Sequence, residues 1–455
     1  MLKVGTAKRC INPAPELFPF ALAFSGDEYA GVKEGQDIHV RCIVTDNGEK
    51  KIVFLGFELG GVPFIERIHA LLKEKYGIEK EDLLATATHN HSAVRPLGKG
   101  GGPIPMPVDD SENMKAYTEF VYKQVEDVIA EAFGKMVPAR FGYGEDKSYI
   151  NVNRDQHFYD GYWMQGQNWE GCSDKTVAVL KFVDEEGKVI AGIVNYAVHS
   201  ITNFTQKDED GKCKISCDFP GICSAWLEKH FGNDSVFIWQ SGAAGNQNPV
   251  LAFASHRYDV NGVGYSDIGM IQPGASYKTC VVIGEQHAVD ALRAFDKANA
   301  DCDELTIKTG ESIVELPGQT FPAGVDRAKH RLLVDNIHLE AIGWKPGMPL
   351  EKHLVDMIPS EEKVPLRTQL ILFGDEVAFY GMNCELYNEI GVLLKEASPY
   401  KHTIVATHTD YSIGYVLDDD SKGRKVFQSF GRVMEGCSNG LIRDGMLKLF
   451  EEVNK

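Results

Sequence analysis

The feature that most constrains this chain is the alternation of β-like runs with amphipathic helical runs along almost its whole length. Within residues 38–58, two apolar runs flank Asn47-Gly48, a strong hairpin signal. Helical spacing of apolar residues follows over 63–76. The same patterns predict further strands and helices: strands within 176–199, 235–240, 304–316, 369–382 and 402–410, and helices at 112–134 (with Phe120 on its apolar face), 219–231, 285–299, 325–341 and 439–453. This alternation predicts an α/β fold (mixed α+β) around mixed sheets.

The domain organisation is predicted from composition along the chain. A length of 455 residues suits one large catalytic domain as well as two or three smaller ones. The Pro-rich stretch 343–365 is the only plausible boundary, and we interpret it as an internal connector of a single domain over 1–455. Residues 253–280 are rich in Gly, Ser and Tyr and predict a long surface excursion, a kind of loop that is often functional.

The charge of the chain narrows its partners and location. A formal net charge of -18 disfavours nucleic acid, which needs clustered Lys and Arg, and also disfavours anionic membrane surfaces. The first residues show no signal peptide, and no apolar run is long enough to span a bilayer. Ten irregularly spaced cysteines are expected to be free thiols. We therefore expect a cytoplasmic protein without stable membrane insertion, whose oligomeric state the sequence leaves open.

Two histidine motifs follow apolar strands. His89 and His91 lie in THNHS, where a strand gives way to a loop, and residues two apart on an extended chain share a face. His199 ends the apolar run NYAVHS. Each motif alone also fits solvated or hydrogen-bonded structural histidines. Histidines at the ends of two separate strands nevertheless favour a shared site, because sheet proteins commonly assemble sites from such loops.

Two further motifs have polar side chains or free backbone groups beside strands. The run QSGAAGNQNP at 240–249 is rich in small residues, which let the backbone approach a ligand, and its N–H groups are candidates for an oxyanion hole. It lacks the Lys-Ser/Thr ending of a phosphate loop. Glu385 precedes a predicted helix, where it fits either a metal ligand or an acidic residue that favours the helix dipole.

These motifs occur in an order that resembles the catalytic region of the neutral/alkaline non-lysosomal ceramidases. The resemblance runs through VGTAKRCINPAP, ATATHNHS, INVNRD, NYAVHS, SCDFPGICSAWLE, QSGAAGNQNP, NCELYNEIG and DYSIGYV, along nearly the whole chain. It implies a zinc-dependent hydrolase that holds one zinc ion through four ligands: His89, His199, Glu385 and Tyr415. Tyr411 is the near alternative to Tyr415 as the fourth ligand.

The resemblance also implies roles around the metal. His91 matches a catalytic residue that would carry a proton to the leaving amine, and Arg154 matches an arginine that lines the pocket and would hold a carbonyl or an anionic group. We expect Asp218 to orient a ligand histidine, and the N–H near Gly242 to share the oxyanion. Water activated by zinc is favoured over Ser241 as the nucleophile.

Several departures from the ceramidase pattern leave the substrate open. We expect neither an immunoglobulin-like domain nor an export signal, and Phe427 and Phe430 stand where the family has tyrosines. Aromatic residues within 159–171, among them Trp163 and Trp169, suit a soluble ring or sugar-like ligand, or local packing. The leading hypothesis is hydrolysis of the amide bond of a small-molecule or lipid-like N-acyl substrate. The alternatives are a carbohydrate-active hydrolase or lyase with the same metal site, and a non-catalytic binding protein.

Overall fold

The computed structural model describes most of the chain, namely residues 1–22, 27–98, 109–157, 163–204, 206–251, 273–318, 362–421 and 438–455, with the short pieces 256–258, 264–266, 424, 426, 428 and 434. Four features of the sequence predictions lie outside the described residues: the helix at 325–341, most of the connector at 343–365, Phe427 and Phe430.

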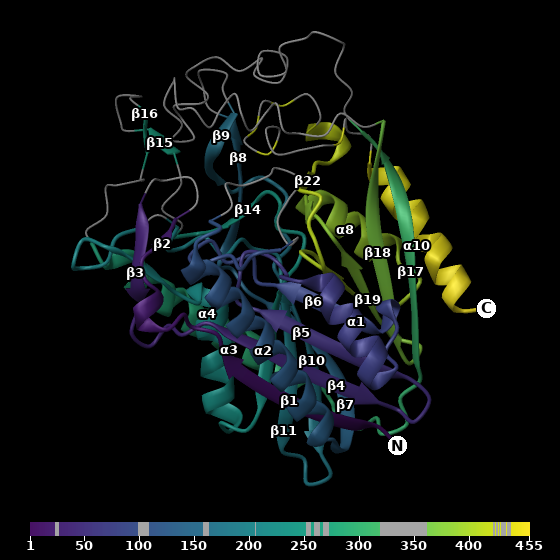
Figure 1. Cartoon of the computed structure of the whole chain (residues 1–455). Helices are drawn as coiled ribbons and strands as arrows, with labels where there is room; N and C mark the ends of the chain where they lie inside the picture. Colours follow the sequence, from purple (N-terminus) through teal and green to yellow (C-terminus); the bar gives the residue numbers. More distant parts are fainter. Residues whose placement is uncertain are drawn as a thin grey trace.

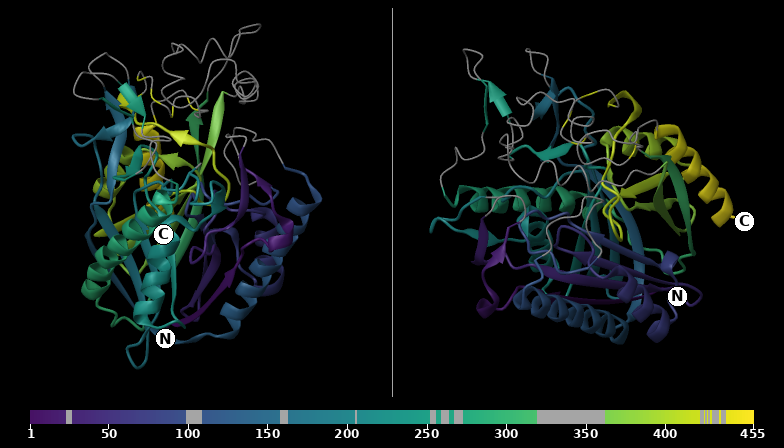
Figure 2. Two further views of the ribbon diagram at one scale, coloured as in Figure 1. Left: turned by 90° about the vertical axis from the view of Figure 1, so that its left-hand side faces the viewer. Right: turned by 45° about the horizontal axis from the view of Figure 1, so that its top comes forward.

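Two sheets packed face to face form the centre of the molecule, and helices cover both outer faces (Figures 1 and 2). The rings of Phe373 and Phe379 lie 6.3 and 6.2 Å from that of Phe54, so aromatic contacts join the two sheets. Full burial of such a side chain contributes about 1.5–3 kcal/mol. The predicted mixed α/β fold class is confirmed.

The larger sheet has eight strands, with parallel pairs at both edges and antiparallel pairs between them. Their spatial order is β13 (Val236–Ser241), β11 (Val189–Tyr196), β10 (Thr176–Asp184), β7 (Val137–Lys147), β1 (Lys3–Cys10), β4 (His39–Asp46), β5 (Lys51–Phe57) and β6 (Leu83–Ala87). The helices on its outer face are α1 (Ile65–Tyr76), α2 (Glu112–Gly134), α3 (Asp218–Phe231) and α4 (Ala275–Lys297).

The smaller sheet has four strands, and the last two pair in parallel. Its order is β17 (Ile307–Pro317), β18 (Lys363–Phe373), β19 (Val377–Met382) and β21 (His402–Ala406). Its outer face packs against α8 (Asn388–Ala397) and α10 (Asn439–Val453). No described helix is long and apolar enough to cross a bilayer.

Small sheets and turns complete the described structure. They are β2 (Phe20–Ala21), β3 (Glu28–Val32) and β12 (Cys213–Ile215); β8 (Asn151–His157), β9 (Trp163–Asn168) and β14 (Gln247–Pro249); β15 (His256–Tyr258) and β16 (Gly264–Ser266); and β20 (Glu385–Leu386) and β22 (Tyr415–Val416). Short 3-10 turns occupy Pro15–Leu17, Lys80–Asp82 and Asp419–Ser421.

One unit occurs three times among the described residues: an antiparallel hairpin, a helix, and a third strand parallel to the second. The three copies are β4-β5-α1-β6, β10-β11-α3-β13 and β18-β19-α8-β21. The sequence shows no repeat because the copies share an arrangement rather than residues. The carboxyl ends of two parallel neighbours meet at one edge of a sheet, where sites commonly form. Each unit thus presents one such pair of strand ends.

Two predictions about helices were wrong in detail. Helix α4 begins at Ala275, ten residues before the predicted start, inside the predicted excursion 253–280. Its first turns bury Tyr277 and Cys280, whose helical spacing is hidden in a Gly/Ser/Tyr-rich context. On α2, Phe120 was predicted to face the core but is 39% exposed, because it lies at the edge of the buried stripe.

Candidate metal centre

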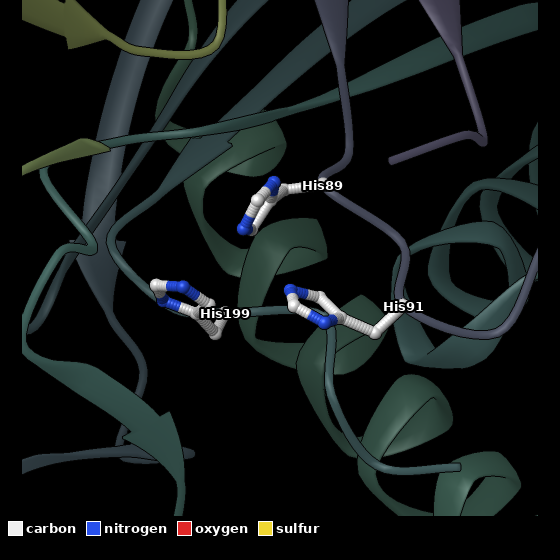
Figure 3. Close-up of side chains that lie close together, drawn as sticks. All are labelled: His89, His91 and His199. Carbon is white, nitrogen blue, oxygen red and sulfur yellow. The ribbon is translucent and has the colours of Figure 1, made fainter. Parts of the chain in front are cut away.

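Three histidines from two units of the fold point toward one another (Figure 3). His89 lies two residues after β6, and His199 lies three residues after β11. With His91, they place one ring nitrogen each within 4.8 Å of one another. The backbone N–H of His91 donates to the carbonyl of Ser200 at 3.1 Å, which joins the two loops. The structure therefore brings together the two histidine motifs, as the sequence pattern favoured.

Backbone carbonyls fix the protonation of the two ligand candidates. His89 Nδ1 lies 3.1 Å from the carbonyl of Gly60, and His199 Nδ1 lies 2.7 Å from the carbonyl of Ala244. A carbonyl only accepts hydrogen bonds, so each Nδ1 must carry the proton. In a neutral imidazole, Nε2 then has a bare lone pair. Burial, followed by the charge of Arg154, lowers the pKa of His199 to about 3, so this ring is neutral at pH 7.

The carboxylate of Glu385 lies beside both Nε2 atoms. Its Oε2 is 3.3 Å from Nε2 of His89 and 3.3 Å from Nε2 of His199, and none of these three buried atoms has a hydrogen-bond partner among the described residues. Two nitrogen lone pairs that face a carboxylate repel unless a cation lies between them. Imidazole nitrogen and carboxylate oxygen are ligands that zinc prefers. The donor set therefore fits a metal ion.

Strand pairing places Tyr415 beside Glu385. Glu385 and Tyr415 are register partners in the parallel pair β20–β22, and the N–H of Glu385 donates to the carbonyl of Gly414 at 2.8 Å. Tyr415 is 8% exposed, whereas the alternative, Tyr411, is 37% exposed. Burial and Glu385 raise the pKa of Tyr415, and Arg154 opposes this shift. Geometry thus favours Tyr415 over Tyr411 as the tyrosine of the centre.

Arg154 is one of the largest fully buried side chains of the described residues. Its guanidinium donates to Asn248 Oδ1 at 3.2 Å, to the carbonyl of Gly245 at 2.6 Å and to Tyr415 Oη at 3.1 Å. The neighbouring Asp155 supplies a negative charge that favours the charged form of Arg154. Arg154 therefore lies buried beside Tyr415, and its Nη1 and Nη2 donors are engaged by the protein rather than directed to a substrate.

The glycine-rich loop after β13 approaches the protein backbone rather than an open space. A Cβ added to Gly245 would lie 2.8 Å from the carbonyl oxygen of Glu385, so only glycine fits there without a shift. The N–H of Gly245 donates to the carbonyl of Leu386 at 2.7 Å. The small residues of this loop thus allow β20, which carries Glu385, to pack directly against it.

Three of the predicted supporting residues lie in other arrangements. The N–H of Gly242 donates to the carbonyl of Tyr196 at 2.8 Å, so it is not available to an oxyanion in this structure. Ser241 is fully buried, and its hydroxyl donates to the carbonyl of Gly242 at 3.3 Å. Asp218 accepts from the N–H groups of Asn203 and Phe219, and backbone carbonyls orient the two candidate ligand histidines in its place.

The sequence prediction missed His408. This residue lies two positions after β21, and its ring stacks on that of His89 with 3.9 Å between centroids and 15° between planes. Both side chains are buried, and both residues have left-handed backbones, with φ of 56° for His89 and 55° for His408. Such φ values are uncommon outside glycine. The shared Ala-Thr-His triplet at the ends of β6 and β21 is the signal that could have revealed the pair.

Stacking predicts a measurable role for His408 in metal binding. We expect His408→Ala to weaken zinc binding roughly two- to tenfold, because a stacked aromatic pair contributes about 0.5–1.5 kcal/mol to holding the His89 ring. His408→Phe keeps a ring and should bind zinc nearly as tightly as the wild type. Competition with a chromogenic chelator measures both affinities. Equal weakening by the two variants would show that the imidazole nitrogen matters and not the ring face.

A buried cluster of Ser148, His287 and Asp290 has the residue types of a hydrolytic triad without its geometry. Ser148 Oγ donates to Asp290 Oδ2 at 2.7 Å and lies 3.0 Å from His287 Nδ1, while Trp239 Nε1 donates to His287 Nε2 at 3.1 Å. Because the hydroxyl proton goes to Asp290, His287 Nδ1 must donate to the serine and is no base for it. The cluster is structural.

This cluster predicts a pH dependence of stability. Burial lowers the pKa of His287 to about 4, from 6.5 for an exposed imidazole. Between these values the unfolded chain binds more protons, so the stability contributed above pH 6.5 is lost as the pH falls toward 4. His287→Gln keeps a donor and an acceptor without titrating. We expect it to flatten the unfolding free energy against pH by up to about 1.4 kcal/mol per pH unit in urea titrations. Equal slopes would contradict this.

The fold and the site together define a class of protein: a mixed α/β protein whose buried histidines and carboxylate could hold a metal ion. No family model matches the sequence. The structure does match neutral ceramidase from Pseudomonas aeruginosa, with a TM-score of 0.68 and 17% identity over 98% of this chain and 73% of that one. A second structure, a ceramidase complexed with C2, matches with a TM-score of 0.68 and 16% identity. That match covers 99% of this chain and 76% of the other. The chain therefore has the fold of neutral ceramidase, as its motifs predicted.

Proposed function

We propose that this protein is a zinc-dependent hydrolase that cleaves the amide bond of an N-acyl substrate. The observation that carries the proposal is the convergence of the bare Nε2 atoms of His89 and His199 on the Glu385 carboxylate, at 3.3 Å each. The fold shared with neutral ceramidase supports it. His89, His199 and Glu385 would hold the ion, with Tyr415 as a fourth, weaker ligand. Zinc supplies a Lewis acid that polarises a carbonyl and makes hydroxide available near neutral pH.

His91 is the proton carrier in this proposal. Its Nε2 is buried and has no hydrogen-bond partner among the described residues. Burial, and then His89 and His199, lower the pKa of His91 well below its usual range. The imidazole is therefore neutral at pH 7, and its unpartnered nitrogen would take up a proton from the attacking water. It would then give that proton to the leaving nitrogen, which must be protonated before it departs as an amine.

Arg154 and Tyr415 act as a pair. The guanidinium donates to Tyr415 Oη at 3.1 Å and would stabilise a phenolate there. Water remains our favoured nucleophile because the Ser241 hydroxyl is fully buried and directed to a backbone carbonyl. Asp218 and Gly242 would support the centre by holding its loops rather than by contact with substrate.

The test compares metal-free protein with protein reloaded with zinc on one panel of compounds. The panel contains N-acyl sphingosines, N-acyl amino acids, N-acetylhexosamines and aryl glycosides, and released amine or sugar is quantified by mass spectrometry. Zinc-dependent release of amine from N-acyl compounds is the expected result. Release from glycosides alone would favour the carbohydrate-active alternative. Zinc binding without release from any compound would favour a binding protein.

A further inference from the structure

Two arginines lie near the candidate metal centre, and the protein satisfies them differently. Arg154 is buried and donates to three protein acceptors. Arg95 lies four residues after His91 and is exposed to solvent. Among the described residues, no hydrogen bond or ion pair engages its guanidinium.

The Arg95 guanidinium lies beside the backbone that orients a ligand histidine. A methyl group placed on Gly60 would be 3.6 Å from Arg95 Nη2, and the carbonyl of this glycine faces His89 Nδ1 at 3.1 Å. Arg95 thus lies against the residue directly behind the His89 ring, within the electrostatic reach of Glu385. A group bound to this guanidinium would be a close neighbour of the centre.

On one side, the Arg95 guanidinium lies against the backbone at Gly60. Although its side chain is exposed, the protein around it desolvates the guanidinium and lowers its pKa, and Glu385 opposes this shift. Glu385 is also the carboxylate that faces the two histidines. When that carboxylate holds a divalent cation, the positive charge of Arg95 has no counter-charge among the described residues.

From these observations we propose that Arg95 binds a carboxylate of the substrate next to the scissile bond, so that the substrate is an N-acyl amino acid rather than a neutral N-acyl amine. The inference rests on the proposed amide hydrolysis. A guanidinium presents paired N–H donors that match the two oxygens of a carboxylate. Partial desolvation strengthens that pairing. Arg95 would therefore be the specificity-determining residue of the site.

The experiment uses matched pairs that differ only in charge: N-hexanoyl glycine, leucine and phenylalanine, each with its neutral amide at the α-carboxyl group. Hexanoate release by the zinc-loaded protein gives kcat/KM for both members of a pair. We expect the acid to be preferred, and Arg95→Gln to lower the acid-to-amide ratio roughly 10- to 100-fold, in the range of a lost charge-assisted contact. Arg95→Lys should retain part of the preference. The control is Arg443→Gln, which removes a partly exposed arginine on α10 and should leave the ratio unchanged.

A second measurement separates this inference from the proposed function. Titration calorimetry on the metal-free protein compares binding of each acid with that of its amide, in wild type and in Arg95→Gln. Arg95-dependent preference for the acid without any hydrolysis would refute the proposed function and leave the carboxylate site intact. Hydrolysis of acid and amide with equal kcat/KM, unchanged in Arg95→Gln, would refute the carboxylate site alone. Neither hydrolysis nor selective binding would refute both.

Discussion

Replacement of both His89 and His199 by alanine is expected to reduce bound zinc from about one ion per chain to none. These side chains supply both bare Nε2 atoms that face Glu385, so no pair of nitrogen donors remains opposite the carboxylate. Amide hydrolysis should fall by more than the roughly 100-fold that loss of a hydrogen-bond partner of a metal ligand causes. Elemental analysis of tag-free protein and the N-acyl assay measure the two effects.

The matched control for this variant is His230→Ala, which removes an exposed histidine from the end of α3. It should keep the zinc content and activity of the wild type. Circular dichroism of both variants establishes that they fold. If the folded double variant retained zinc at the wild-type ratio, the ion would lie elsewhere and the proposed centre would be wrong.

Arg154→Met is expected to cost about 3–5 kcal/mol of unfolding free energy, the range for removal of one partner from a buried charged network. Methionine keeps much of the volume, so the loss reports the polar contacts rather than a cavity. It removes the positive charge of Arg154 from beside Asp155, and it leaves Asn248 Oδ1 and Tyr415 Oη without their donor from Arg154.

Arg95→Met provides the comparison, because it removes an arginine near the same centre that no described residue engages. A change within about 0.5 kcal/mol is expected, as for other exposed positions. Urea denaturation of the metal-free proteins gives both values and keeps zinc from contributing to stability. If both variants lost a similar amount of unfolding free energy, the assignment of Arg154 as structural and Arg95 as substrate-binding would be contradicted.

The hairpins and most helices could be predicted because their signals are local. Asn47-Gly48 marks the turn between β4 and β5, and apolar spacing marks α1 and α10. The packing of two sheets into four layers depends on contacts such as Phe54 with Phe373, more than 300 residues apart, which no local pattern contains.

The contrast between local signals and long-range contacts also explains which parts of the candidate site could be predicted. Histidines at strand ends and a carboxylate before a helix were visible as residue types in strong local contexts. The hydrogen bonds of Gly242 and Asp218 were not, because their partners, Tyr196 and Asn203, are chosen by the fold. His408 was missed because a single histidine after a strand becomes informative only when His89 is seen stacked on it.

Placement of the site at the ends of strands from all three repeated units has a consequence for how the chain unfolds. A metal ion held by His89, His199 and Glu385 would close loops of 110 and 186 residues, counted between successive ligands. Such an ion acts as a reversible cross-link, and the entropy of loop closure makes a link across long stretches stabilising in the same way as a distant disulfide. The first, second and third units would then separate only when the ion leaves. The midpoint temperature of thermal unfolding would consequently rise with the concentration of free zinc.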